Sequence, residues 1–322
     1  MILVTGKHGQ LGWELRRALA PLGPVAAVGP GELHLEDAAE IRRVLRKLRP
    51  TIVVNAAAYT GADGAEGQEE LAMAVNGVAP AVIADEVRRL GGGLVHFSDG
   101  CVFDGVKRGP YDEGDPPRPA SLDGETRVAG ESGVRGVGVP HLIFRTSWVY
   151  GARGRGFLRA TLDAAAAGRP LRALSDQLGA PTWCRLVAEA AALVLAQTGA
   201  AQRPDALEDY GGTYHLASAG ETTWCGFARA VLERAPEPLR SRADLVTPVA
   251  TRDPRAPDGR PANARLNCAK FTETFGLALP DWRESLDLAM EELDPGAGNA
   301  RLERDFTGPR TRARRPRSTT EA

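Results

Sequence analysis

Short apolar runs alternate with longer segments of helical periodicity through the first half of the chain. The apolar runs are 2–4, 25–28, 52–55, 94–98 and 141–146, and the helical segments between them are 10–22, 38–48, 71–90 and 125–134. Strands that are covered on both faces by crossover helices give such runs without polar alternation. The pattern therefore predicts an α/β fold with a Rossmann-type, doubly wound parallel sheet, whose ligands lie at the carboxyl ends of the strands.

The pattern changes after Trp148. Helical segments are expected at 157–167, 184–197, 224–234 and 282–293, and the Pro-rich, charged stretch 236–261 is interpreted as loop. We predict that residues 1–150, with about 180–217, form a dinucleotide-binding domain. Residues 151–179 and 218–294 would form a smaller C-terminal substrate domain. Residues 295–322 are rich in Gly, Pro, Arg, Ser and Thr and predict a disordered basic tail, with a nucleic-acid-binding arm as the alternative.

The composition of the chain limits the kinds of molecule that it is expected to bind. The 322-residue chain has 40 basic and 41 acidic residues, so no overall field attracts nucleic acid or anionic lipid. It has no apolar run long enough for a membrane span and no secretory leader at its start, which predicts a cytoplasmic protein. The four cysteines are widely separated and the five histidines are not at ligand spacing, so no metal site is expected.

The first strand runs into a glycine-rich turn. Gly6, Gly9 and Gly12 precede a helix, which is the arrangement that lets a backbone approach a pyrophosphate at a helix N-terminus. This start predicts NADP or NAD as cofactor. The second strand ends in Gly29-Pro30-Gly31, which offers neither a carboxylate for a ribose hydroxyl nor an arginine for a 2′-phosphate. The choice between the two cofactors stays open.

Several blocks, in order, carry a resemblance to a known family. They are Asn55-Ala-Ala-Ala-Tyr59-Thr60, Ala74-Val75-Asn76, Val102-Phe103-Asp104-Gly105, Arg145-Thr-Ser-Trp148-Val-Tyr150-Gly151, Asp176-Gln-Leu-Gly-Ala-Pro181-Thr-Trp183 and Arg260-Pro261-x-Asn263-x-Arg265-Leu266. Over about residues 1–294 the chain resembles the dTDP-4-dehydrorhamnose reductase family of extended short-chain dehydrogenases/reductases. The resemblance implies NAD(P)-dependent hydride transfer to a dTDP-4-keto-6-deoxysugar or related nucleotide sugar. It leaves a homodimer open.

The chain departs from this family where the catalytic group is expected. The family block Ser-Thr-Asp-Tyr-Val-Phe-Asp-Gly corresponds here to 98–105, with Asp99 in place of the hydroxyl residue and Cys101 in place of the aromatic one. The catalytic Tyr and Lys correspond to Asp123 and Arg127. An ordinary Asp is ionised at neutral pH, and an Arg does not shuttle protons, so the usual proton donor is missing.

The resemblance and the glycine turn together assign candidate site residues. The catalytic candidates are Asp99, Cys101, Asp123 and Arg127. The substrate-binding candidates are Cys101 and Trp148. The cofactor-binding candidates are Gly6, His8, Gly9, Gln10, Leu11, Asn55, Ala56, Ala57, Tyr59, Asn76 and Arg127.

Three functions remain open at this point. The first is a reductase that uses a substitute acid. The second is a non-redox enzyme in which Asp99 and Asp123 form an acid/base pair, with Cys101 beside them as nucleophile or substrate contact. The third is a binding or regulatory subunit in which Asp123 and Arg127 form only an i,i+4 ion pair.

Overall fold

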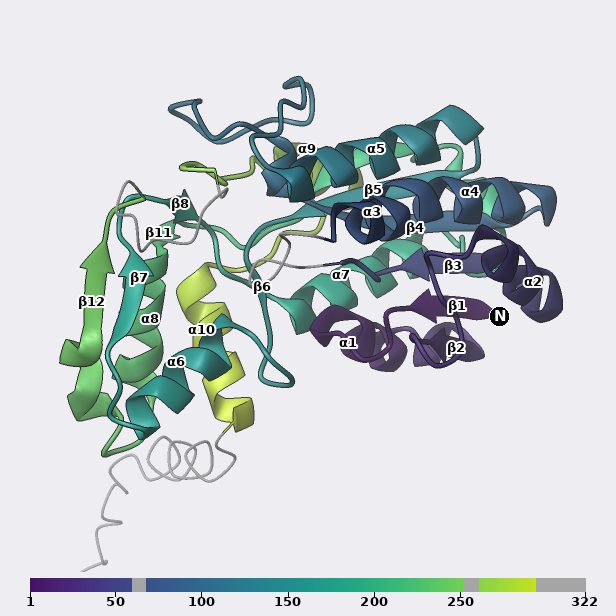
Figure 1. The fold of residues 1–322 in the computed structure, drawn as a ribbon. Coiled ribbons are helices and arrows are strands. Elements are labelled where there is room, and N and C mark those ends of the chain that lie inside the picture. Colours follow the sequence, from purple (N-terminus) through teal and green to yellow (C-terminus); the bar gives the residue numbers. More distant parts are fainter. Residues whose placement is uncertain (60–67, 252–260, 294–322) are drawn as a thin grey trace, which may run out of the picture.

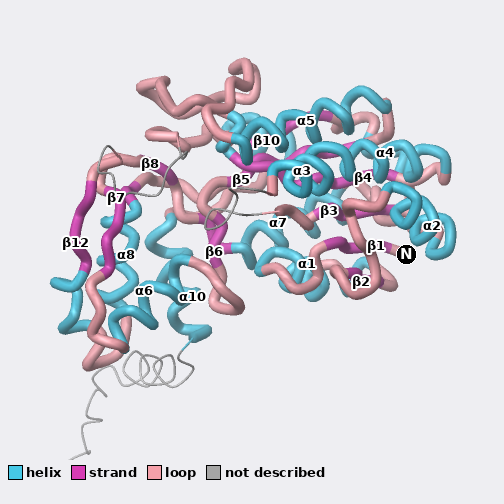
Figure 2. Tube along the Cα trace, in the orientation of Figure 1, coloured by secondary structure: helices cyan, strands magenta, loops and turns pink. Residues whose placement is uncertain are grey.

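A six-stranded parallel sheet organises the first part of the computed structural model, which describes residues 1–59, 68–251 and 261–293. The strands are β1 (Ile2–Thr5), β2 (Val25–Val28), β3 (Ile52–Asn55), β4 (Gly93–Asp99), β5 (His141–Thr146) and β10 (Gly212–His215). Their order is β10-β5-β4-β3-β1-β2 (Figures 1 and 2). The order reverses at β1, which is where such sheets bind ligands. The expected Rossmann-type fold class is confirmed.

Helices cover both faces of this sheet. One face packs on α1 (Gln10–Ala18) and α7 (Cys184–Gln197), and the other packs on α2 (Ala38–Leu48), α4 (Ala79–Arg89) and α5 (Leu122–Val137). Adjacent residues of one strand therefore enter different cores, because side chains alternate across a strand. Val4 packs on the α1 face and Leu3 on the α2 face, and both are fully buried.

Capping and proline residues set the ends of these helices, and several of the helix bounds differ from the predicted ones. The segment expected as one helix at 71–90 is α3 (Glu69–Ala72), a π-helical turn at Met73–Val78, and α4. The helix expected to continue to residue 22 ends at Ala18, and a 3₁₀ turn at Ala20–Leu22 follows, with Pro21 unable to donate a helical hydrogen bond. Helix α5 starts earlier than expected, because Ser121 Oγ caps it by accepting from Gly124 N at 3.2 Å.

The second part has its own apolar core. Helices α6 (Phe157–Ala166), α8 (Trp224–Arg234) and α10 (Trp282–Leu293) pack with a parallel strand pair, β7 (Leu171–Leu174) and β12 (Val246–Val249). The interpretation of 236–261 as loop is wrong for β12 and for the 3₁₀ turn at Arg240–Leu245. Val246 and Val249 are both buried against this core, which holds the strand in place although Pro248 interrupts its donors.

The remaining elements are short. They are the short strands β6 (Val149–Tyr150), β8 (Leu178–Gly179), β9 (Thr182–Trp183) and β11 (Thr222–Thr223), the helix α9 (Ala269–Phe275), and 3₁₀ turns at Gly100–Val102 and Pro204–Leu207. Helix α9 was not expected; its Phe271 and Phe275 pack on the β10 side of the sheet core. In the part of the chain that the structure describes, no helix is long and apolar enough to cross a membrane. The expected basic tail, 295–322, lies outside the described residues.

Candidate functional site

The glycine-rich turn between β1 and α1 is held by backbone contacts that exclude side chains. Gly6 has φ of +78°, and a Cβ on it would lie 2.9 Å from the Ala57 backbone. A Cβ on Gly12 would lie 2.1 Å from the Gly6 carbonyl oxygen, which also accepts from Gly9 N at 2.9 Å. The turn is therefore as tight as a phosphate-binding loop requires, and it opens the N-terminus of α1. These residues fit a dinucleotide pyrophosphate.

A cavity of about 380 Å³ lies beside this turn, at the carboxyl ends of β1, β2 and β3. Among the expected cofactor residues, it is lined by Gly6, His8, Gly9, Ala56, Ala57 and Tyr59. Its other walls come from the segment after β2 and from the helical region after β3. The structure thus brings the glycine turn and the block after β3 together around one space that suits an adenosine dinucleotide.

Other expected cofactor residues support the cavity from outside its walls. Asn55 is buried, accepts from Thr5 Oγ1 at 2.6 Å and contacts His96 Nδ1 at 3.1 Å. Asn76 holds the backbone of Tyr59 through Oδ1 and Nδ2, at 2.7 and 3.0 Å. Gln10 donates to the Arg155 carbonyl oxygen, and Leu11 packs between the two cores. For Asn55 and Asn76 the geometry indicates positioning of the loop after β3.

Sequence reasoning singled out Gly29 and Pro30 after β2 but assigned no cofactor-binding residue to this wall of the cavity. This wall is made by Val28, Gly29, Pro30, Leu33, His34, Leu35 and Glu36. The available signal was position alone, since the residues after the second strand of such a fold meet the adenosine ribose. Lys7 and Glu32 form an ion pair at the same end of β2.

The four catalytic candidates form one connected cluster where β4 meets the first turn of α5. Asp99 Oδ1 accepts from Cys101 N at 2.9 Å, and Cys101 Sγ lies 3.5 Å from Asp123 Oδ2. Arg127 Nε donates to Asp123 Oδ1 at 3.1 Å, so the i,i+4 ion pair expected from the sequence is present. The Asp123 side chain is 46% exposed and that of Arg127 only 11%. The cluster thus has one open carboxylate and one partly buried cation.

The ionisable groups of this cluster have different proton affinities. Burial raises the pKa of Asp99, although the charge of Arg127 opposes it. Burial also raises the pKa of the Cys101 thiol well above its ordinary value, and the charge of Asp99 adds to this. A thiol that stays protonated is a poor nucleophile, which favours substrate contact over nucleophilic attack for Cys101. Asp99 is then the carboxyl best placed to hold a proton.

A buried ionic network holds the elements that carry the cluster. Glu131 of α5 accepts from Ser98 Oγ at 2.6 Å and from Arg145 Nε and Nη2 at 2.8 and 2.6 Å. All three side chains are at most 3% exposed. Burial alone would raise the pKa of Glu131, but the bonds from Arg145, Ser98 and Arg135 outweigh it and lower the pKa to about 2. The network joins β4, α5 and β5 below the site.

Trp148, the expected substrate contact, lies in an aromatic stack. Its ring packs on Trp224 with centroids 3.9 Å apart and an angle of 17°. A Cβ on Gly179 would lie 2.4 Å from the same ring, so only glycine fits there. Trp148 has φ of +46°, a conformation that side-chain-bearing residues rarely adopt. The second part of the molecule therefore fixes this indole.

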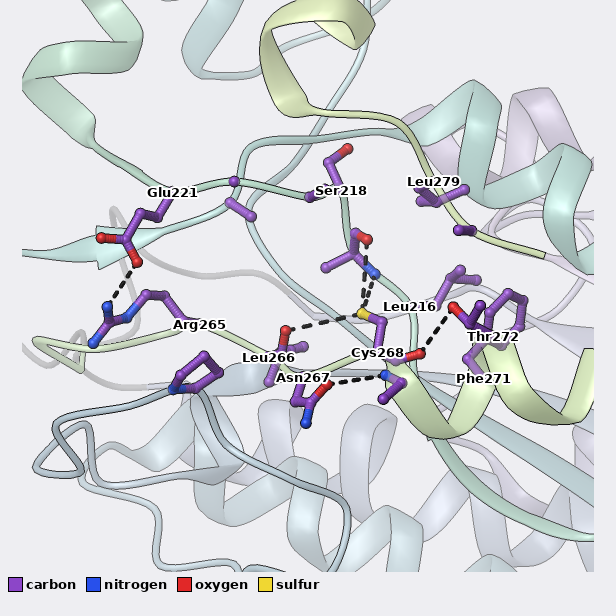
Figure 3. Close-up of a pocket in the computed structure, with 17 residues that line it drawn as sticks. Leu216, Ser218, Glu221, Arg265, Leu266, Asn267, Cys268, Phe271, Thr272 and Leu279 are labelled. Carbon is purple, nitrogen blue, oxygen red and sulfur yellow. Dashed lines mark hydrogen bonds and ion pairs between the residues drawn. The ribbon is translucent and has the colours of Figure 1, made fainter. Parts of the chain in front are cut away.

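A second cavity, of about 450 Å³, lies between α9 and the connecting segments (Figure 3). Arg265 donates to Glu221 Oε2 at 2.7 Å on its rim, and Cys268 Sγ lies 3.3 Å from Ala217 N. The segment 262–267 borders this cavity and forms backbone hydrogen bonds on two sides. On one side, Ala264 N donates to the Leu178 carbonyl oxygen at 2.7 Å. On the other, the backbone of Tyr111 forms hydrogen bonds with residues 265 and 267. The charged groups on this rim satisfy one another.

Comparison with known proteins gives a consistent result. A family model, the RmlD substrate binding domain, matches residues 1–294. The chain is 40% identical over 295 residues to a dTDP-4-dehydrorhamnose reductase of Burkholderia thailandensis, covering 91% of this chain and 98% of that one. It is 37% identical over 300 residues to the enzyme of the same name from Escherichia coli, covering 91% and 97%.

Solved structures agree with these sequence matches. A dTDP-4-dehydrorhamnose reductase of Clostridium acetobutylicum superposes with a TM-score of 0.80 at 28% identity, covering 91% of this chain and 99% of that one. One from Bacillus anthracis, in complex with NADP, gives 0.78 at 26% identity and covers 90% and 98%. The similarity thus covers nearly the whole described chain. The chain belongs to the dTDP-4-dehydrorhamnose reductase family.

Proposed function

We propose that this chain reduces the keto group of a dTDP-4-keto-6-deoxysugar or a related nucleotide sugar with NADP or NAD, and that Asp99 donates the proton. The observation that carries this proposal is the half-buried Asp99 carboxyl at the end of β4, which accepts from Cys101 N and has a raised pKa, beside an Asp123–Arg127 ion pair. Family membership supports the reaction class, since the relatives above are named dTDP-4-dehydrorhamnose reductase. We place the nucleotide sugar next to the cluster of Asp99, Cys101, Asp123 and Arg127.

The glycine turn and the loop after β3 would hold the cofactor. Its pyrophosphate fits at Gly6 and Gly9, and Tyr59 and Ala57 border the same cavity. The bound dinucleotide supplies the hydride that reaches the keto carbon. Asn76 keeps the loop in place through both backbone atoms of Tyr59.

The proton then comes from the chain itself. As the carbonyl carbon gains the hydride, its oxygen takes the proton from Asp99 and becomes the hydroxyl, leaving Asp99 as a carboxylate. The Cys101 N–H and the nearby Arg127 stabilise that carboxylate, and water returns its proton. Asp123, which is paired with Arg127, serves as an acceptor for substrate hydroxyls. Cys101 and Trp148 are the proposed substrate contacts.

The test is cofactor oxidation with dTDP-4-dehydrorhamnose, using Asp99→Asn and, as the matched control, Asp123→Asn. Loss of a general acid typically lowers the rate about 10²–10⁴-fold, and we expect this for Asp99→Asn. We expect less than about a tenfold loss for Asp123→Asn, since that group is not the donor. Equal losses in both variants, or an unchanged rate in Asp99→Asn, would refute the assignment of the donor.

A restoring variant separates an atypical reductase from the other functions. Asp123→Tyr with Arg127→Lys rebuilds the family pattern, and we expect its rate to exceed that of the unaltered chain by at least about tenfold. Consumption of the sugar without cofactor oxidation would instead support the non-redox acid/base enzyme. Binding without any turnover, in the restored variant as well, would support the binding subunit. The homodimer stays a prediction, which sedimentation would test.

A further inference from the structure

Gly29, the first residue after β2, has its side-chain space taken by the glycine turn. A Cβ on Gly29 would lie 2.7 Å from His8 Cδ2 and 3.3 Å from Lys7 Cγ. In dinucleotide-binding folds, the residue at the end of the second strand contacts the adenosine ribose. His8 and Lys7 therefore stand where that contact is made, and any ribose-binding carboxylate has to come from another position.

Glu32 brings a carboxylate to this same place. A turn between Gly29 and Glu32 closes with Glu32 N donating to the Gly29 carbonyl oxygen at 2.9 Å. Glu32 Oε2 in return accepts from Gly29 N at 3.0 Å, and Oε1 forms an ion pair with Lys7 Nζ. The bond from Lys7 lowers the pKa of Glu32, so this carboxylate is ionised at neutral pH. Its side chain is 48% exposed, and its neighbours Gly29 and Leu33 line the cavity.

The charge around this point disfavours a further anion. The ammonium of Lys7, whose stem lies beside Gly29, is already paired with Glu32. Glu36 lies on the cavity wall, and Asp37 and Glu40 follow at the start of α2. His34 and Arg43 are nearby counter-charges, and both are paired with Glu40 at 2.8 Å. A phosphate placed here would face several carboxylates.

We propose that Glu32, held by Lys7 and Gly29, binds the adenosine ribose and makes this chain select NAD(H) over NADP(H). The free 2′-hydroxyl of NAD(H) donates to the Glu32 carboxylate, whereas the 2′-phosphate of NADP(H) meets its negative charge. The inference rests on the dinucleotide cavity of the proposed function. It also sets this chain apart from the Bacillus anthracis relative, which was solved with NADP.

The experiment is calorimetric binding of NAD⁺ and NADP⁺ to the full chain without sugar substrate. We expect NAD⁺ to bind at least about tenfold more tightly. In Glu32→Gln, the amide oxygen still accepts from Gly29 N, but the charge is gone and Lys7 is released for a phosphate. We therefore expect the preference to shrink by at least about tenfold, through tighter NADP⁺ binding. The matched control is Glu189→Gln on α7, whose carboxylate is 46% exposed, pairs with Arg17 and lies outside the cavity wall. It should change the preference by less than about threefold.

Each outcome bears on the inference. Tighter NADP⁺ binding by the unaltered chain, or an unchanged preference in Glu32→Gln, overturns the role of Glu32 and leaves the proposed reductase intact. Equal effects of Glu32→Gln and Glu189→Gln overturn it too, because they indicate an effect of the overall charge of the protein and not of one carboxylate. Binding of neither dinucleotide at millimolar concentration removes the cofactor site itself, and the proposed function with it. Thermal melting of each variant verifies that it is folded.

Discussion

The glycine turn after β1 and the cluster at the end of β4 solve different physical problems. In the turn, the same atoms serve packing and binding, because Gly6 and Gly12 leave no room for a Cβ. At the end of β4, the buried side chains of Ser98, Glu131 and Arg145 form a hydrogen-bonded layer that supports the fold. The candidate catalytic groups form a second, upper layer over it. The four catalytic candidates, Asp99, Cys101, Asp123 and Arg127, are all in the upper layer.

The difference teaches where chemistry can change without loss of the fold. A substitution in the turn moves backbone, so binding and folding are lost together. A substitution at Asp123 or Cys101 changes the chemistry offered to a ligand and leaves the buried network beneath it in place. The departures from the family pattern are therefore compatible with an intact, ligand-binding protein.

The largest effect is expected for Glu131→Ala, which tests whether the buried layer below the site is structural. It leaves Arg145 buried without its partner, and we expect a loss of about 3–5 kcal/mol in the free energy of unfolding. Arg135→Ala removes a partner that is 39% exposed and should cost less than about 1 kcal/mol. Chemical denaturation measures both. A loss below about 1 kcal/mol for Glu131→Ala would contradict a separate structural layer.

Acid should weaken the same region through His96. Burial lowers the pKa of His96 in the folded protein to about 4, whereas an unfolded His titrates near 6.5. The unfolded state therefore binds the extra proton first, so stability is full above about pH 6.5 and falls by about 3 kcal/mol as pH drops to about 4. Unfolding measured across this range should have a shallower pH slope in His96→Gln. The same slope in both proteins would contradict the prediction.

In the glycine turn, Gly12→Ala should cost stability and binding together. The added Cβ would overlap the Gly6 carbonyl, which we expect to lower the free energy of unfolding by about 1–3 kcal/mol and to weaken dinucleotide binding more than about tenfold. Gly136→Ala, on an open face of α5, is the control and should be neutral or stabilise by up to about 1 kcal/mol. Normal binding by a destabilised Gly12→Ala protein would break the proposed link between packing and binding.

The smallest effect is expected for the stability of Asp123→Asn. Its ion pair with Arg127 has an open carboxylate, so we expect a change of at most about 0.5 kcal/mol in the free energy of unfolding. Differential denaturation against the unaltered chain measures it. A loss above about 2 kcal/mol would place Asp123 in the structural layer instead of the reactive one.

Patterns of apolar residues predicted most of the sheet, since buried parallel strands read directly as short apolar runs. The glycine spacing predicted the turn, and the family blocks predicted that Asp99, Cys101, Asp123 and Arg127 meet. Helix α9 and strand β12 were missed, because their stability comes from distant contacts of Phe271 and Val246 and not from local pattern. The position of Glu32 at Gly29 N depends on a turn geometry that no spacing rule gives.

The segment 262–267 has backbone hydrogen bonds to two different regions of the molecule. Its backbone is hydrogen-bonded to Leu178 on one side and to Tyr111 on the other, so it links β8 to the loop after β4. Because these hydrogen bonds are made on both sides, the backbone of this segment is stiff where it passes between β8 and the loop after β4. Slow amide exchange at Ala264 together with Leu178 would report that stiffness.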